Sequence, residues 1–277
     1  MSSHLRDHSG KTNARVLVGL ISVFHPLPSF TMSFLAIFIF YIAAGVDNNL
    51  EGLFFGLVVL LTNFVIGATN DLLDQPWDRT VKPNKPLVKG FVSQRMVLGI
   101  LGAILLLLGL LYTSFSPEMV FLLVGGLFVG MTYNLGLKRS VWSWVPITVA
   151  FSLLLTASLR LAEQEWSEII NLLPFVILLT PPVHIANQMH LFEESLGSGE
   201  RNLLHVLGRV RGLILSSLLL VFSVLFLTYY KDVGMIPIGL LTTLIISFAV
   251  LGVLDQRRAL LPILVLYIAM LGWLLLG

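Results

Sequence analysis

Three aspartates stand at regular spacing in a short polar stretch, NDLLDQPWD at residues 70–78, of an otherwise apolar chain. Asp71, Asp74 and Asp78 are three and four positions apart, so on a helix they project from one face. Like charges on one face repel each other unless a cation neutralises them. Carboxylate oxygens suit Mg²⁺, which commonly bridges carboxylates to substrate phosphates. The spacing predicts a Mg²⁺ site formed by the three aspartates, although Pro76 can end or bend the helix before Asp78.

A basic segment, RTVKPNKPLVKG at residues 79–90, follows the acidic one directly. Alone, such a segment is equally typical of a solvated cytoplasmic loop. Next to a metal site it favours diphosphate binding, and we predict Asn70, Arg79 and Lys82 among the diphosphate-binding residues. Acids to hold metal, bases to hold phosphate and an apolar bundle to hold a hydrocarbon tail together indicate a prenyl diphosphate as substrate.

The composition identifies the class of protein that must position these residues. Of 277 residues, 56% are hydrophobic and 12% are charged, whereas soluble domains have about 25% charged residues. This excludes a soluble domain, a disordered chain and a disulfide-stapled secreted protein. The chain has no Cys, which excludes thiolate catalysis and Cys-ligated metals. We therefore predict an all-α, polytopic membrane protein.

Nine apolar segments are long enough to span a bilayer, which takes roughly 20 residues. They cover about 16–45, 51–73, 93–114, 118–135, 142–162, 168–190, 210–230, 234–254 and 259–276. The first is too long for the apolar region of a signal peptide, so it is expected to remain as a span. The sequence thus predicts a polar tail (1–15) and a single domain (16–277) of nine transmembrane helices around a central cavity.

The basic residues set the orientation of this bundle. With alternating spans, 15 of the 17 Lys and Arg residues fall on one side, and only Arg160 and Lys231 fall on the other. The positive-inside rule makes the rich side, with the N-terminus, cytoplasmic. We expect an integral, multi-pass protein of the plasma (inner) membrane of a prokaryote, with its active-site loops on the cytoplasmic side.

The segment NDLLDQPWDRTVKPNKPLVKG resembles the first signature of the UbiA-type intramembrane prenyltransferases, Asn-Asp-x-x-Asp-x-x-x-Asp followed by a basic segment ending in Pro-Leu-x-x-Gly. All four signature positions match, at Asn70, Asp71, Asp74 and Asp78. The expected topology also agrees, so the resemblance covers nearly the whole chain. It implies Mg²⁺-dependent transfer of a prenyl group from a polyprenyl diphosphate to an acceptor, often aromatic. The diphosphate would ionise to an allylic carbocation, with the three aspartates as catalytic residues and metal ligands.

A second segment of the same resemblance follows the fourth predicted span. The sequence YNLGLKR at residues 133–139 is similar to a Tyr…Leu-Lys segment of the family. The resemblance implies that Tyr133 and Lys138 help to bind diphosphate. Without it, Tyr133 is equally an interfacial aromatic residue and Lys138 an anchor at the membrane surface.

The family's second acidic motif is degenerate here. Its frame is retained, because Asn187, Gly199 and Arg201 fall in register, but the two expected aspartates are replaced by Leu191 and Ser195. The chain is therefore similar to a bacterial or archaeal member of the family with an altered second motif.

Other residues of this segment can substitute for the missing aspartates. Glu193 or Glu194 supplies a carboxylate to the metal in one interpretation, and both are plain loop acids in the other. Asn187, His190 and Arg201 are predicted to bind diphosphate.

Three functions remain open at this point. The first is the prenyltransferase, whose partners are a prenyl diphosphate, an unidentified small-molecule acceptor and membrane lipid, with no nucleic acid. The second is a terpene cyclase on the same scaffold, which needs no acceptor. The third is an inactive, lipid-binding homologue, which the altered second motif favours and the complete first motif opposes, because unused intramembrane carboxylates are only costly.

Overall fold

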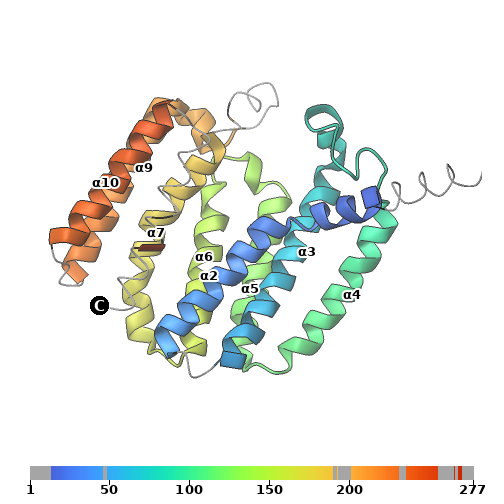
Figure 1. Cartoon of the computed structure of the whole chain (residues 1–277), viewed down its shortest axis with the longest axis horizontal. Helices are drawn as coiled ribbons and strands as arrows, with labels where there is room; N and C mark the ends of the chain where they lie inside the picture. The colour runs from blue at the N-terminus through green and yellow to red at the C-terminus, as the bar shows by residue number, and fades with distance from the viewer. Residues whose placement is uncertain are drawn as a thin grey trace, which may run out of the picture. The chain divides into compact units, whose positions relative to one another are not determined.

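The computed structural model describes residues 14–45, 49–189, 192, 201–230, 235–254, 265 and 268–269. In these ranges the regular elements are helices, with no strand (Figure 1), which confirms the all-α class. The main helices are α2 (Pro26–Ala44), α3 (Asn49–Val81), α4 (Gln94–Tyr112), α5 (Pro117–Asn134), the 3₁₀ turn η1 (Leu137–Arg139), α6 (Trp144–Leu161), α7 (Trp166–Met189), α9 (Leu203–Tyr230) and α10 (Met235–Leu254).

Within the described residues, seven helices are long and apolar enough to cross a membrane. They are α2 to α7 and α9, and each matches one of the predicted apolar segments. The helix α10 coincides with the eighth predicted segment, and most of the ninth, 259–276, lies outside the described residues. The chain is a multi-pass membrane protein, and the predicted number of nine spans is not confirmed.

The described residues divide into two compact units. Residues up to Ile37 and Leu50–Phe121 form the first unit, which contains α2 up to Ile37, nearly all of α3, and α4. Residues 38–49 and those from Leu122 onward form the second unit, which contains α6, α7, α9 and α10.

The first predicted span, expected as one run over 16–45, is instead two helices. A short apolar helix, Ala14–Val23, ends at a turn, and α2 begins at Pro26. Between them His25 has a φ of +48°, a left-handed conformation that side chains other than Gly seldom adopt. Proline is well suited to the first position of a helix and disfavours helical backbone in the residue before it, so Pro26 accounts for the break.

The acidic motif lies within one continuous helix. Pro76 does not end α3, which runs on to Val81, because a proline inside a membrane helix is tolerated where the surroundings satisfy the freed backbone groups. All four signature residues are therefore helical, and the predicted end of this span near residue 73 is eight residues too early.

The second unit has a polar seam between two of its helices. Thr180 of α7 donates a hydrogen bond to Thr148 of α6 at 2.8 Å, and the Ser143 hydroxyl lies 2.9 Å from Nε2 of His184. Hydrogen bonds between apolar helices fix their packing, because lipid offers no competing partner. His184, which is buried, therefore has a structural partner.

Candidate functional site

The aspartates of α3 differ in their burial. Asp71 and Asp78 are 4% and 2% exposed, whereas Asp74 and Asn70 are half-buried. Two charged carboxylates removed from water require compensating partners. The structure supplies these partners from two other segments of the first unit.

The first partner is Lys85, from the loop between α3 and α4. Its Nζ donates hydrogen bonds to Oδ1 of Asp71 at 2.7 Å and to Oδ2 of Asp78 at 2.6 Å. The lysine side chain is 20% exposed. Burial alone lowers the pKa of Lys85, but the hydrogen bonds to both carboxylates and their negative charges outweigh it and raise this pKa above its ordinary value of 10.5. One ammonium thus pairs with both buried carboxylates and offsets half of their charge.

The loop backbone holds Lys85 in place. The Lys82 amide donates to the Asp78 carbonyl at 2.8 Å and the Lys85 amide to the Lys82 carbonyl at 3.1 Å, so the chain turns tightly where α3 ends. Leu87 is 3% exposed, and its backbone carbonyl accepts a hydrogen bond from the side-chain amide Nε2 of Gln75 on α3 at 3.1 Å. The buried leucine and this hydrogen bond fold the loop back along α3, which places Lys85 beside the carboxylates.

The second partner is His25, from the break before α2. Its Nε2 lies 2.9 Å from Oδ1 of Asp71, the same oxygen that accepts from Lys85. The Ser29 hydroxyl donates to the carbonyls of Phe24 at 3.2 Å and His25 at 2.9 Å, which secures the backbone of the break. The strained conformation of His25 therefore aims its imidazole at Asp71.

Gly67 allows the backbone at His25 to lie close to α3. It lies one helical turn before Asp71, and a Cβ at this position would be 3.2 Å from Cδ2 of His25 and 3.2 Å from the carbonyl oxygen of Phe24. A side chain here would be in tighter than ordinary contact with the break. The absence of one lets the backbone at His25 pack directly on α3.

The donor set fits a hard cation. Two buried carboxylate oxygens, one from Asp71 and one from Asp78, converge on a single positive group, and oxygen ligands of this type are those that Mg²⁺ takes. Within the described part of the chain, no three His, Asp or Glu side chains are gathered as a metal centre. The ligand set of Asp71, Asp74 and Asp78 therefore stays a prediction.

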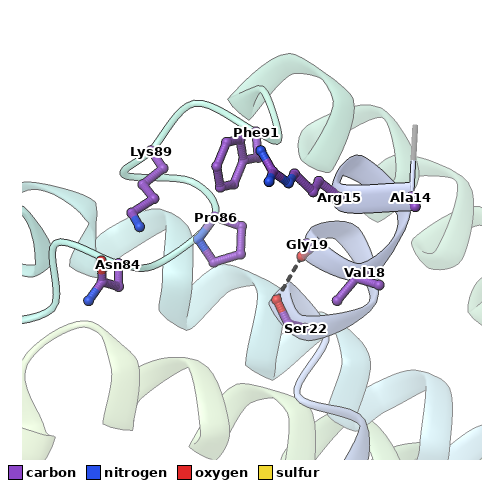
Figure 2. A pocket seen from close by; sticks show the side chains of 9 residues that line it. All are labelled: Ala14, Arg15, Val18, Gly19, Ser22, Asn84, Pro86, Lys89 and Phe91. Atoms are coloured by element: carbon purple, nitrogen blue, oxygen red, sulfur yellow. Dashed lines mark hydrogen bonds between the residues drawn. The ribbon is translucent and has the colours of Figure 1, made fainter. Parts of the chain in front are cut away.

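Arg79 and Lys82, predicted to bind diphosphate, are both exposed, at the end of α3 and the start of the following loop. Further along this loop, Lys89 lines a groove of about 610 Å³ with Arg15 of the helix Ala14–Val23. Figure 2 shows both side chains at this groove, together with Pro86 and Phe91. The basic segment therefore divides: Lys85 folds back onto the carboxylates, while Lys89 lies at a separate groove.

The remaining predicted residues belong to the second unit. Tyr133 lies in the last turn of α5 and Lys138 lies in η1, and both are half-buried. The backbone amide of Arg201 donates to the carbonyl of Arg139 at 3.0 Å, so the second motif contacts the Tyr133–Lys138 segment. Asn187 is exposed on α7.

Asn202, next to Arg201, is a residue of this unit that the sequence did not single out. It is 1% exposed, donates to Gln188 at 3.4 Å and accepts from the His205 amide at 3.1 Å, so it caps the start of α9. Three predicted residues, His190, Glu193 and Glu194, lie outside the described residues.

The sequence did not place Lys85 or His25 in the predicted site. Lys85 was one of several equivalent bases in the loop. His25 had a usable signal, an ionisable side chain beside a proline within an apolar run, and such residues at membrane depth are functional candidates by default.

Comparison with solved structures shows the same fold in membrane proteins. A structure of digeranylgeranylglyceryl phosphate synthase is 16% identical, with a TM-score of 0.72 over 95% of this chain and 98% of that one. A UbiA homologue from Archaeoglobus fulgidus, bound to GPP and Mg²⁺, is 17% identical, with a TM-score of 0.72 over 93% and 99%. The apo UbiA homologue from Aeropyrum pernix K1 is 14% identical, with a TM-score of 0.62 over 92% and 95%.

Sequence comparison gives the family. No curated protein matches the chain significantly. A family model, however, matches residues 30–275, which include α3 with its acidic motif and all the helices that follow it. The chain belongs to the UbiA prenyltransferase family.

Proposed function

We propose that this protein is a Mg²⁺-dependent intramembrane prenyltransferase. The observation that carries the proposal is the pair of buried carboxylates, Asp71 and Asp78, that share one cation at the end of a membrane helix in a UbiA family chain. The similarly folded A. fulgidus homologue, solved with GPP and Mg²⁺ and with DMAPP and Mg²⁺, supports both the donor class and the metal.

Asp71, Asp74 and Asp78 would hold the metal. When bound, Mg²⁺ there neutralises the diphosphate and stabilises it as a leaving group. His25 fixes the orientation of Asp71 through the 2.9 Å contact, so that this carboxylate is positioned before substrate arrives.

The basic and polar residues would bind the diphosphate oxygens. In the first unit these are Lys85 with Asn70, Arg79 and Lys82, and an ammonium or guanidinium makes charge-assisted hydrogen bonds to phosphate. In the second unit we assign Tyr133, Lys138, Asn187, His190 and Arg201 to the same role. Glu193 or Glu194 would add a carboxylate in place of the missing aspartates.

The apolar helices would supply a water-poor environment. Ionisation of the donor gives an allylic carbocation, which water would quench, so the bundle must exclude water until the acceptor attacks. We place the site on the cytoplasmic side, because 15 of 17 basic residues, including those of the α3–α4 loop, fall on that side.

The test uses the purified full-length protein with Mg²⁺ and a panel of prenyl diphosphates of different chain length, with and without aromatic acceptors. We expect metal-dependent diphosphate release and a prenylated acceptor identified by mass. A cyclic hydrocarbon formed without acceptor would instead identify a terpene cyclase, and no release with any donor would contradict an enzymatic function.

A matched pair of variants locates the activity. Asp71→Asn should lower turnover by at least about 100-fold, since it removes a charge that acts on the leaving group. Glu51→Gln makes the same change of charge at the other, exposed end of α3 and should leave turnover unchanged. Equal turnover in the two variants would contradict the metal assignment.

A further inference from the structure

We propose that Lys85 couples metal binding to diphosphate binding, because its ammonium pairs with the two carboxylates that the metal needs and moves away from them only when an anion is present to bind it. This inference rests on the proposed function and adds a thermodynamic role for a residue of the α3–α4 loop.

The contacts of Lys85 put it in competition with a metal. Its ammonium already uses Oδ1 of Asp71 at 2.7 Å and Oδ2 of Asp78 at 2.6 Å. Oδ1 of Asp71 is also contacted by His25 at 2.9 Å. A divalent cation that takes these oxygens must therefore replace the ammonium.

Charge makes this replacement unfavourable for a metal alone. With Asp74 counted, the three proposed ligands and Lys85 carry two net negative charges, which a divalent cation would cancel in total, but the metal and the ammonium would then lie beside the same oxygens of Asp71 and Asp78. At such short range, in a partly buried site, the repulsion between metal and ammonium is much stronger than in water. A diphosphate removes the conflict, because its oxygens bind the metal and the displaced ammonium together.

The loop keeps the displaced ammonium close to the site. Leu87 is buried, and a Cβ on Gly19 would lie 3.0 Å from Cβ of Pro86, so the residues after Lys85 are packed against the helix Ala14–Val23. The loop backbone is thus restrained, while the lysine stem has four flexible carbons. Movement of Lys85 is confined to its side chain, which stays within reach of a diphosphate bound beside Asp71 and Asp78.

His25 keeps the Asp71 carboxylate in its orientation during the exchange. When Lys85 leaves Asp71, the imidazole still contacts the same oxygen, because the secured break before α2 fixes its position. Asp71 thus keeps its orientation while its cationic partner changes.

The experiment measures binding, not turnover. Mn²⁺ affinity of the full-length protein in nanodiscs is followed by electron paramagnetic resonance, for free Mn²⁺ and for the preformed Mn²⁺–pyrophosphate complex. For the wild type we expect the complex to bind at least about tenfold more tightly than Mn²⁺ alone, a coupling of the usual allosteric size. Lys85→Gln should bind free Mn²⁺ at least about fivefold more tightly than the wild type and lose most of the preference for the complex.

Two further variants keep the test decisive. Arg95→Gln removes the same charge from an exposed position at the start of α4 and should retain the wild-type preference. Lys85→Arg keeps the charge and should retain both folding and the preference, even if Lys85→Gln folds poorly. Free Mn²⁺ binding to folded Lys85→Gln that is no tighter than to the wild type, or loss of the preference in Lys85→Arg, would overturn the inference.

The outcome is separable from that of the proposed function. Prenyl transfer by a wild-type protein that shows no preference for the complex would overturn the coupling and leave the function standing. A clear preference without transfer of any prenyl group would overturn the function, while the exchange of Lys85 between carboxylates and pyrophosphate would hold.

Discussion

Replacement of Gly67 by alanine tests whether the packing of the His25 break on α3 determines the geometry of the site. The new Cβ would be 3.2 Å from Cδ2 and 3.3 Å from Cβ of His25, and 3.2 Å from the carbonyl oxygen of Phe24. These atoms cannot move independently, because that carbonyl accepts a hydrogen bond from Ser29 and His25 already has a strained φ of +48°. The substitution must therefore shift the break by a few tenths of an ångström.

Two opposing free-energy terms set the expected change in the unfolding free energy of Gly67→Ala. Alanine is more favourable than glycine in a helix interior by up to about 1 kcal/mol. Overpacking of a well-packed site costs roughly 1–3 kcal/mol. Gly102→Ala, in the middle of α4, provides the reference, because a Cβ there has nothing within 4 Å. The difference in unfolding free energy between the two variants isolates the contact term, and we expect Gly67→Ala to be the less stable by about 1–3 kcal/mol.

The assay is reversible unfolding of each variant from mixed micelles, together with the apparent Mg²⁺ affinity in the transferase reaction. A displaced imidazole lengthens the 2.9 Å contact with Asp71, so Gly67→Ala should need severalfold more Mg²⁺ while Gly102→Ala should not. If the two variants have the same stability within about 0.5 kcal/mol, the usual range for substitutions that touch nothing, the break is not held against Gly67 as described.

Two further predictions concern stability. Because the pKa of Lys85 is raised in the folded state, its stabilising contribution is complete below pH 10.5 and is lost as the pH rises through the folded value. The unfolding free energy in metal-free buffer should fall above about pH 10.5 for the wild type and less for Lys85→Met, and equal slopes would contradict this. Ser143→Ala should destabilise the second unit by about 1–3 kcal/mol, because buried His184 loses its 2.9 Å partner. Ser247→Ala is the control, because this half-buried serine of α10 makes only an exposed hydrogen bond to the Thr243 carbonyl of its own helix, and an equal effect in both variants would show that the buried contact is unimportant.

The sequence predicts those features of the site that depend on local pattern. The apolar runs locate most of the helices, although the first run is broken in two, α3 extends eight residues further and α9 begins seven residues earlier than predicted. The three-and-four spacing of Asp71, Asp74 and Asp78 places them on one helix. The family signature identifies the chain over most of its length. These predictions succeed because hydrophobic length and helical period are properties of neighbouring residues.

The features that the sequence missed depend on tertiary packing. Nothing in the segment RTVKPNKPLVKG distinguishes Lys85 from Lys82, because burial of Leu87 and its hydrogen bond to Gln75 decide which lysine reaches the carboxylates. The break at His25 was missed because the apolar pattern continues through it. A 30-residue apolar run is longer than the roughly 20 residues that span a bilayer, and this excess was the available sign of a break.

The burial of Asp71 and Asp78 places a requirement on the rest of the motif. A carboxylate that is more than nine-tenths buried is strongly destabilising unless it is paired, so a folded chain needs a cation there whether or not a metal is bound. Lys85 meets this need from seven residues beyond Asp78, a distance that the turn at Lys82 makes short in space. A lysine is suited to the task because its single ammonium can leave two carboxylates at once and remain nearby on a flexible stem. The basic segment after the acidic motif therefore has a structural reason to exist before any diphosphate arrives, and the same residue that stabilises the fold is the one positioned to meet the substrate.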